Sequence, residues 1–155
     1  MDATQRNTTF LKHISTIQRC TMRYFETALA GLSGCSIGYG QQFFLLRISE
    51  HEGISLQELA HRGNYDKATV TKAVQKLAAC GLITVEPDDR DRRIRRLYLT
   101  SQARELTARI YDIRDSWRDR LIEGFDDNEK RQVEELLGKM ALRAWELTEK
   151  GGNHS

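Results

Sequence analysis

Residues 66–100 read DKATVTKAVQKLAACGLITVEPDDRDRRIRRLYLT, and this stretch decides the fold. Its first half predicts an amphipathic helix over 66–79, because apolar residues recur there at intervals of three and four. Asp66 is placed to cap this helix, and Gly81 is placed to end it with a left-handed residue. An apolar β-branched run, a Pro-Asp-Asp turn, five arginines and a second apolar run then predict a β-hairpin. Helix, strand, basic loop and strand in this order are typical of a helix-turn-helix with a wing.

The residues just before this stretch complete the helix-turn-helix. Ser55 and Glu58 have the spacing of a capping box, which predicts a short helix over 56–62. A turn at 63–65 then leads into the 66–79 helix. Two helices joined by three or four residues that include glycine form a helix-turn-helix, and the second of them enters the major groove of DNA.

Four further helices are predicted outside this motif from their apolar periodicity. One spans 9–30, a second at 41–52 is apolar on most sides, and two more span 101–123 and 126–150. The apolar stripes of the long helices are longer than one small domain can cover, so we expect a homodimer formed through 9–30 and 101–150. The alternative is an internal hairpin in which 101–123 packs against 126–150.

The expected fold class is therefore mostly α with a small β-wing. A chain of 155 residues is long enough for one domain with its own core. We expect residues 1–155 to form that single domain, in which 41–100 make the winged helix-turn-helix and the long helices on either side make the dimer interface.

Positive charge is concentrated where the motif lies. The whole chain carries a net charge of only +2, which by itself indicates no partner. Residues 61–100 hold nine Lys/Arg and five Asp/Glu, the remainder holds 15 and 17, and no acidic residue occurs between Lys67 and Val85. A local positive excess is the electrostatic footprint of nucleic-acid binding. A solvated basic surface is the alternative that charge counts alone leave open.

Polar side chains on these elements are candidates for contact with DNA. On the outer face of the helix, threonine methyls and a glutamine amide suit bases in the major groove, and lysines suit phosphates. Arginines at the tip of the wing suit the narrow minor groove of A/T-rich DNA. Asp91 is expected to pair with a neighbouring arginine, and of Arg95 and Arg96 one is expected to reach the DNA backbone and the other to pack. The predicted DNA-contacting residues are Lys67, Thr69, Thr71, Lys72, Gln75, Lys76, Arg90, Arg92 and Arg93.

The stretch from Thr69 to Ala103 resembles the MarR (multiple antibiotic resistance regulator) family of winged helix-turn-helix transcription factors. The matching positions are Leu77, Gly81-Leu82-Ile83, Asp91-Arg92-Arg93, Thr100 and Ala103, and the order of helices matches along the whole chain. Lys72 stands where the family usually has arginine or a small polar residue, and lysine lacks the planar guanidinium fork. The resemblance implies a homodimeric regulator, most often a repressor, that binds an inverted repeat in double-stranded DNA.

The resemblance also implies a pocket between the dimer helices and the winged region that takes a small aromatic or anionic effector. Arg47 is the most informative candidate, because a charge on an otherwise apolar helix needs either an acidic partner or an anionic ligand. Each aromatic candidate has the alternative of being part of the core. The candidate ligand-binding residues are Phe10, His13, Tyr24, Phe44, Arg47 and Tyr111.

The three cysteines are widely spaced and odd in number, so they fit the reduced thiols of a cytosol better than a disulfide framework. The resemblance to a peroxide-sensing branch of the family makes Cys20 a candidate for a redox role, with Arg19 and Arg23 favouring its thiolate, although that branch has its reactive cysteine earlier in the first helix. Cys35 is a second candidate because it lies in the glycine-rich loop. A reduced thiol without such a role is the default expectation. The first residues lack the apolar region of a secretory signal and no run spans a bilayer, so a cytoplasmic protein without membrane contact is expected.

An enzyme is not expected, because the sequence has no phosphate-binding loop, no nucleophile motif, no metal-ligand spacing and no cofactor motif. The stronger rival is a winged-helix module that binds another protein instead of DNA. Such a module would carry acids or large apolar residues on the outer face of the 66–79 helix, and that face has neither.

Overall fold

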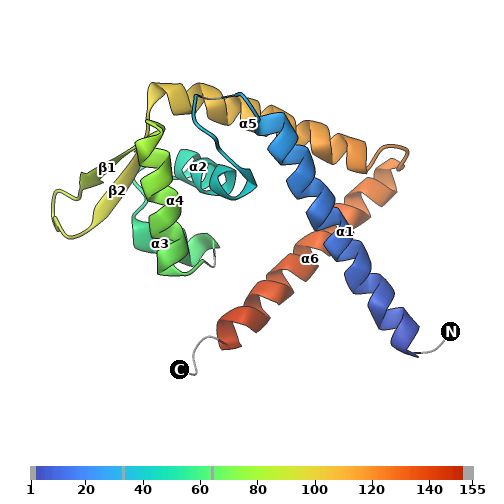
Figure 1. The fold of residues 1–155 in the computed structure, drawn as a ribbon. Helices are drawn as coiled ribbons and strands as arrows, with labels where there is room; N and C mark the ends of the chain where they lie inside the picture. The colour runs from blue at the N-terminus through green and yellow to red at the C-terminus, as the bar shows by residue number, and fades with distance from the viewer. Residues whose placement is uncertain (1–2, 33, 64, 152–155) are drawn as a thin grey trace.

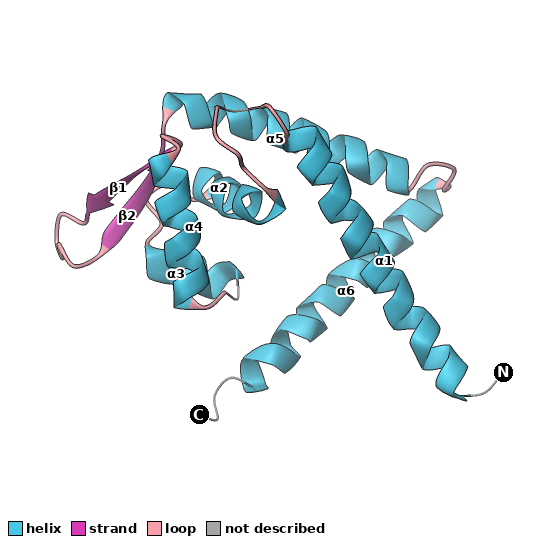
Figure 2. Ribbon diagram, viewed as in Figure 1, coloured by secondary structure: helices cyan, strands magenta, loops and turns pink. Residues whose placement is uncertain are grey.

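The computed structural model describes residues 3–32, 34–63 and 65–151 of the chain. Six helices and two strands occur in this part of the chain, and helices dominate the ribbon in Figure 2. This architecture confirms the predicted mostly α fold with one small β-hairpin. In chain order the elements are α1 (Ala3–Leu29), α2 (Tyr39–Glu50), α3 (Leu56–Gly63), α4 (Lys67–Ala79), β1 (Ile83–Pro87), β2 (Arg95–Leu99), α5 (Ser101–Leu121) and α6 (Asp127–Gly151).

The core lies in the winged region, where α2, α3, α4, the hairpin and the first half of α5 pack together (Figure 1). α2 is central to this region, and its apolar run places Leu45 and Ile48 fully inside. α4 buries the face predicted from the sequence, including Val70 and Leu77. Because one face of α4 is buried in the core, its opposite face is exposed to solvent.

Side-chain caps fix the ends of the helix-turn-helix as the sequence predicts. The Asp66 carboxylate accepts hydrogen bonds from the backbone N–H of Thr69 at 2.8 Å and from its hydroxyl at 2.7 Å. The N–H of Glu58 donates to the Ser55 hydroxyl at 3.1 Å, and the N–H of Ser55 donates to the Glu58 carboxylate at 2.8 Å. Gly81 follows α4 with φ of +69°, a conformation that residues with a Cβ rarely adopt. These local contacts set the direction of α4.

The wing is fixed to the helix-turn-helix along its root. β1 and β2 are antiparallel, with Ile83 opposite Leu99. The loop between α2 and α3 adds a third segment, because the N–H of Gly53 donates to the carbonyl of Leu97 at 2.8 Å and the N–H of Leu97 donates to the carbonyl of Ile54 at 3.0 Å. The turn between the two strands extends beyond this root, at the side of the molecule away from α1 and α6 (Figure 1).

Two helices begin earlier than predicted. α1 begins at Ala3 rather than at residue 9, and α2 begins at Tyr39 rather than at residue 41. The side chain of Gln41 accepts a hydrogen bond from the N–H of Gly38 at 2.9 Å, so α2 is able to begin inside the glycine-rich segment.

α1 and α6 leave large apolar side chains exposed, as the stripes in the sequence predict. No described side chain of α6 is buried, and α6 makes no extended packing contact with α5. The alternative of an internal hairpin between 101–123 and 126–150 is therefore wrong. None of the helices in the described residues has the length and apolarity that crossing a bilayer requires. The exposed apolar residues of the two helices include Phe10, Leu11, Ile14, Ile17, Leu136, Leu137, Met140, Leu142 and Leu147.

The structure corrects the expectation of three reduced thiols. Cys35, between α1 and α2, forms a disulfide with Cys80, the residue that caps the C-terminus of α4, and their Cα atoms are 5.6 Å apart. The two cysteines are 45 residues apart in the sequence, and their spacing gives no sign that the glycine-rich segment returns to the end of α4. Cys20 is a free, exposed cysteine on α1.

Candidate nucleic-acid interface and effector cavity

The outer face of α4 is the first candidate site. Since apolar residues hold the inner face in the core, the polar residues between them point outward. Five of the six α4 residues predicted to contact DNA come together in one shallow surface hollow, and the sixth, Lys76, is exposed in the last turn. The hollow is lined by Lys67, Ala68, Thr69, Thr71, Lys72 and Gln75.

Two threonines on this face already have their hydroxyl hydrogens engaged. Thr69 donates to the Asp66 carboxylate at 2.7 Å, and Thr71 donates to the carbonyl of Lys67 at 2.8 Å. Their methyl groups and oxygen lone pairs remain available to a ligand. In contrast, the side chains of Lys72 and Gln75 make no hydrogen bond within the described residues, so α4 presents an unengaged ammonium and an unengaged amide.

Asp88 organises the turn of the wing. Its carboxylate accepts hydrogen bonds from the N–H groups of Arg90 at 2.9 Å and Asp91 at 3.0 Å, and from Nε of Arg96 at 2.8 Å. The bond from the N–H of Asp91, followed by that from Arg96, lowers the pKa of Asp88 from 3.8 to about 2. The carboxylate is therefore ionised at neutral pH and holds the turn in one conformation.

Arg96 ties this turn to the helix-turn-helix. Besides Asp88, its guanidinium donates to the carbonyl oxygen of Gly53 at 3.1 Å and lies 3.4 Å from the carboxylate of Glu58. Arg95 is exposed, whereas Arg96 is half-buried, so the expectation that one of this pair packs is confirmed. Arg96 thus positions the wing, and it is not among the side chains that the wing offers outward.

The three arginines predicted at the wing tip, Arg90, Arg92 and Arg93, all lie in the turn between β1 and β2 and are exposed. Nε of Arg93 lies 3.1 Å from the Asp91 carboxylate, which confirms the predicted pairing of Asp91 with a neighbouring arginine. The side chain of Arg93 nevertheless remains 92% exposed. Contact of these arginines with DNA stays a prediction.

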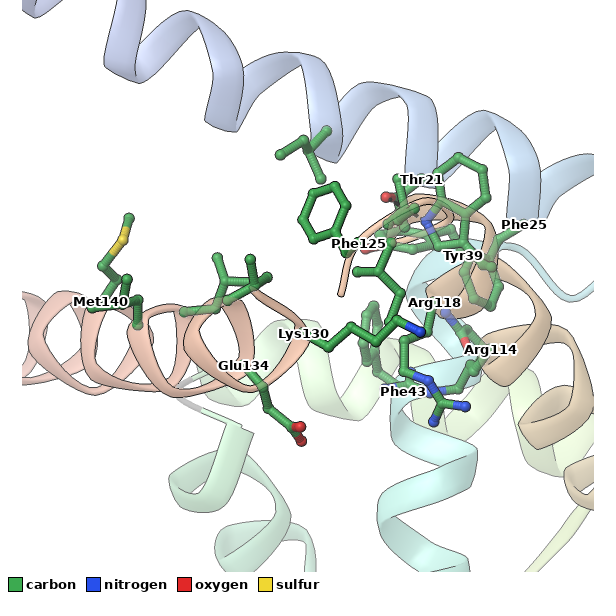
Figure 3. Close-up of a pocket in the computed structure, with 18 residues that line it drawn as sticks. Thr21, Phe25, Tyr39, Phe43, Arg114, Arg118, Phe125, Lys130, Glu134 and Met140 are labelled. Carbon is green, nitrogen blue, oxygen red and sulfur yellow. Dashed lines mark hydrogen bonds between the residues drawn. The ribbon is translucent and has the colours of Figure 1, made fainter. Parts of the chain in front are cut away.

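The second candidate site is a cavity of about 850 Å³ between α1, α2, α5 and the first turns of α6 (Figure 3). A volume in this range accommodates a small organic molecule. Its walls carry the aromatic rings of Phe25, Tyr39, Phe43 and Trp117. Cationic side chains from α5, together with Lys130 and the acid Glu134 from α6, lie at the same cavity. Its other walls are aliphatic and include exposed side chains of the α1 and α6 stripes, so the cavity opens onto those apolar faces.

Two polar side chains at the cavity form no hydrogen bond or salt bridge within the described residues. Gln42 is fully buried, and neither its amide nitrogen nor its amide oxygen has a hydrogen-bond partner within the described residues. Arg114 is half-buried, lies 5.5 Å from the centroid of the Phe43 ring and forms no salt bridge in the described part of the chain. Burial raises the pKa of Tyr39, so its phenol is neutral at physiological pH. A cation without an acidic partner among aromatic rings complements a planar molecule with an anionic group, and the orphaned amide of Gln42 is enclosed beside this site.

Two of the predicted ligand-binding residues are engaged elsewhere. Arg47 forms a salt bridge with Glu50 at 2.7 Å, so of the two alternatives weighed for it, an acidic partner and a ligand, the structure shows the acidic partner. Tyr111 donates a hydrogen bond to the same carboxylate group at 3.1 Å. Neither residue lines the cavity.

The other predicted ligand-binding residues also lie outside the cavity lining. Phe44 is buried in the core, where its ring packs against Tyr65 with centroids 4.7 Å apart. Tyr24 stacks on Trp117 with ring centroids 4.5 Å apart, so it backs the cavity wall without forming it. Phe10 and His13 are exposed on α1.

The sequence analysis did not point to Gln42 or Arg114. α2 is apolar on most sides, so periodicity does not say which side faces the cavity. The available signals are a glutamine at the start of the run Phe43–Leu46 and an arginine directly after Ile113 in the stripe of α5. Both are polar residues inside apolar segments, which is where buried polar groups with a function are found.

Comparison with known proteins gives transcriptional regulators as relatives of this chain. A model of the MarR family matches residues 39–94, from the start of α2 to the turn of the wing. The uncharacterized HTH-type transcriptional regulator YybA of Bacillus subtilis (strain 168) is 29% identical over 115 residues, covering 72% of this chain and 77% of the relative. Relatives of this kind are named transcriptional regulators, which supports the prediction that the chain is not an enzyme.

Solved structures that are similar to this chain also include a MarR protein. The MarR protein from Peptoclostridium difficile DA00132 has 32% sequence identity and a TM-score of 0.81, covering 87% of this chain and 86% of that chain. Streptococcus pneumoniae FabT, solved in complex with DNA, has a TM-score of 0.81 and covers 91% of this chain and 99% of that chain. Its sequence identity is 17%, so this second likeness shows a shared fold alone.

Proposed function

Because this chain belongs to the MarR family of transcriptional regulators, we propose that it is a homodimeric, sequence-specific repressor that binds double-stranded DNA and is released by a small ligand. In this proposal residues 1–155 act as one cytoplasmic domain, in which 41–100 read DNA and 9–30 and 101–150 dimerise. The observation that carries it is the outer face of α4, which is free of acidic residues and offers an unengaged lysine and glutamine.

The proposed reading surface divides into base contacts and phosphate contacts. The amide of Gln75 has a donor and an acceptor for adenine, and the threonine methyls beside it suit the methyl of thymine. Lys67 and Lys76 lie at the two ends of α4 and suit phosphates, which position the helix without reading sequence. Lys72 donates to a phosphate or to a single base acceptor, because it lacks the fork of arginine. The exposed arginines of the wing turn suit an adjacent minor groove.

A homodimer is proposed because the apolar face of α6 and that of α1 before Phe25 have no cover within the described residues. Large contiguous apolar patches are rare on the surface of soluble monomers and mark interaction surfaces. A second copy presents the same two faces, and two-fold symmetry is the commonest way for a chain to cover itself. Two copies of α4 in such a dimer would lie about one turn of DNA apart, so the target would be an inverted repeat.

A small aromatic anion is the proposed effector, and the cavity beside Gln42 and Arg114 is its proposed site. The cavity is lined by α2, which belongs to the winged region, and by α1, α5 and α6, which belong to the proposed dimer interface. A ligand there is able to favour one arrangement of these helices over another, and a difference in affinity between two arrangements shifts their populations. Arg114→Met is expected to remove the preference for an anion while keeping the length of the side chain.

Selection of bound sites from random duplex DNA, followed by single substitutions, tests the function. We expect an inverted repeat. Lys76→Ala should weaken binding to all duplexes and reduce the salt slope by about one, whereas Gln75→Ala should relax preference at one position per half-site at a cost of about 1–3 kcal/mol. Equal losses on all sequences for both variants would contradict these roles. Failure to bind any duplex in low salt would favour a protein-binding module instead.

A further inference from the structure

Cys35 and Cys80 connect two parts of the chain that have different roles in the proposed function. Cys35 lies in the segment that follows α1, and Cys80 is the residue at which α4 ends, where its N–H donates to the carbonyl of Lys76 at 3.0 Å. Their Cα atoms are 5.6 Å apart, within the range that a disulfide spans without movement of the backbone. A covalent link therefore runs from the segment that follows an assembly helix to the end of the helix proposed to read DNA.

The link closes a loop that contains the entire helix-turn-helix. The 45 residues of separation include α2, α3 and α4 in full. The segment that carries Cys35 is also anchored in the core by Ile37 and then continues into Tyr39, a wall residue of the cavity. The end of α1, the bridge to α4 and the cavity wall thus follow one another within a single short segment.

Neither cysteine is deeply buried. Both are of intermediate exposure, and Cys80 packs against the edge of the core without being enclosed by it, whereas inert structural cysteines are usually fully buried. Gly34, next to Cys35, has open space where a side chain would lie. Small thiols and disulfides therefore reach this pair without unfolding of the domain, and the pair is separate from the exposed Cys20 on α1.

We propose that Cys35 and Cys80 form a site of reversible oxidation by low-molecular-weight disulfides, and that the oxidised chain binds DNA more tightly than the reduced chain. One cysteine thiolate attacks the small disulfide, forms a mixed disulfide and releases one small thiol. The second cysteine attacks the mixed disulfide at the protein sulfur and releases the other small thiol. Two protein thiols thus lose two electrons and two protons, which the two small thiols take up.

We expect tighter DNA binding by the oxidised chain because the disulfide restrains the end of α4. This inference rests on the proposed DNA-binding function. In the oxidised chain the end of α4 is held against the segment that leaves α1, so the reading helix keeps a fixed relation to the dimer body. Reduction removes the covalent link and leaves the segment held only by noncovalent contacts such as those of Ile37. A reading helix that is restrained less tightly loses more conformational entropy on an operator with one fixed half-site spacing.

The experiment compares one protein in two redox states. The full chain carrying Cys20→Ser is treated with oxidised glutathione or with dithiothreitol, and a duplex recovered by selection is the probe. We expect a cross-linked peptide between positions 35 and 80 only after oxidation, with duplex affinity about fivefold higher, at the low end of coupling between sites. The melting temperature should also rise by about 10 °C, as closing a loop of this length implies.

The matched control adds Cys35→Ser to the same background, and this double variant should bind the duplex equally well under both treatments. Equal affinity of the oxidised and reduced Cys20→Ser chain, or no cross-linked peptide, would overturn the inference while leaving DNA binding intact. Absence of duplex binding in both states would overturn the proposed function as well. Because both redox states belong to one polypeptide, the comparison does not depend on whether the double variant folds.

Discussion

The winged region and the long helices differ in how completely one chain buries their apolar side chains and pairs their charged ones. In the winged region the apolar face of α4 is buried, and carboxylates such as Glu52 and Asp88 are held by arginines at 2.8 Å. On α6 the apolar side chains are exposed, with Leu137 at 55%. The winged region is thus complete within one chain, whereas we interpret the long helices as half of an interface. Stability and assembly should therefore respond to different substitutions.

Leu137→Glu is expected to have the largest effect, because it places a charge in the proposed interface; since Leu137 also lines the cavity, the variant is measured without any effector. The chain should become monomeric by light scattering, and duplex affinity should fall by about 10²- to 10⁴-fold as the benefit of two linked reading heads is lost. Arg131→Glu, on the polar side of the same helix, is the control and should leave the dimer intact. A Leu137→Glu chain that still dimerises would place the interface elsewhere.

Leu77→Ala should have the next largest effect, and it lowers the stability of the winged region. Leu77 is fully buried, so its truncation should lower the free energy of unfolding by about 2–5 kcal/mol. The same change at Leu142 should stay within about 0.5 kcal/mol, because this side chain is 57% exposed and lies three turns after Arg131 on the polar side of α6, outside the proposed interface. Urea denaturation of the two variants measures both values. Similar losses at the two sites would remove the distinction between a completed core and an open helix.

Arg96→Met should have a smaller effect on stability than Leu77→Ala, and a comparison with Arg95→Met separates the roles of the two arginines. It removes the guanidinium donor from Asp88 and from the carbonyl of Gly53, so the melting temperature should fall by a few degrees and duplex binding should weaken as the wing turn loosens. Arg95→Met removes the same charge from an exposed position and should leave the melting temperature unchanged. Calorimetry measures the melting temperatures of both variants. Equal values would contradict the role of Arg96 in holding the wing turn.

Titration of Asp88 should give the smallest effect. Its folded-state pKa of about 2 lies below the ordinary 3.8, so the ionised carboxylate stabilises the fold above about pH 4, and this stabilisation is lost as the pH falls toward 2. In Arg96→Met the pKa of Asp88 should rise yet stay below 3.8, because the N–H of Asp91 is the larger cause of the shift and remains. Carbon-detected NMR of the Asp88 carboxyl measures both values. An unchanged pKa in the variant would contradict the contact.

Local chemistry made the winged region predictable from the sequence. The caps at Ser55 and Asp66 and the left-handed Gly81 act through neighbours in the chain, so their residue types and spacing are sufficient to predict them. The inner and outer faces of α4 follow in the same way from its periodicity. The exposed stripes of α1 and α6 were predictable for the same reason, since the stripes are longer than the core they could join.

Contacts between distant segments were not predictable from the sequence. Which side of α2 faces the cavity depends on how that helix packs, because nearly all of its sides are apolar, and so Gln42 was missed. Arg47 is a local exception: the sequence analysis left open an acidic partner or a ligand, and Glu50 one turn away is the acidic partner. The bridge between Cys35 and Cys80 depends on the return of a glycine-rich segment to the end of α4, and no periodicity encodes that path.

Sedimentation of the full chain with a selected inverted-repeat duplex most directly tests whether this protein reads DNA as a pair of chains. The mass of the complex gives its stoichiometry, and a salt series shows whether phosphate contacts hold it together. We predict two chains per duplex at low salt and progressive release as salt rises. One chain per duplex, or free duplex at the lowest salt, would contradict the central claim.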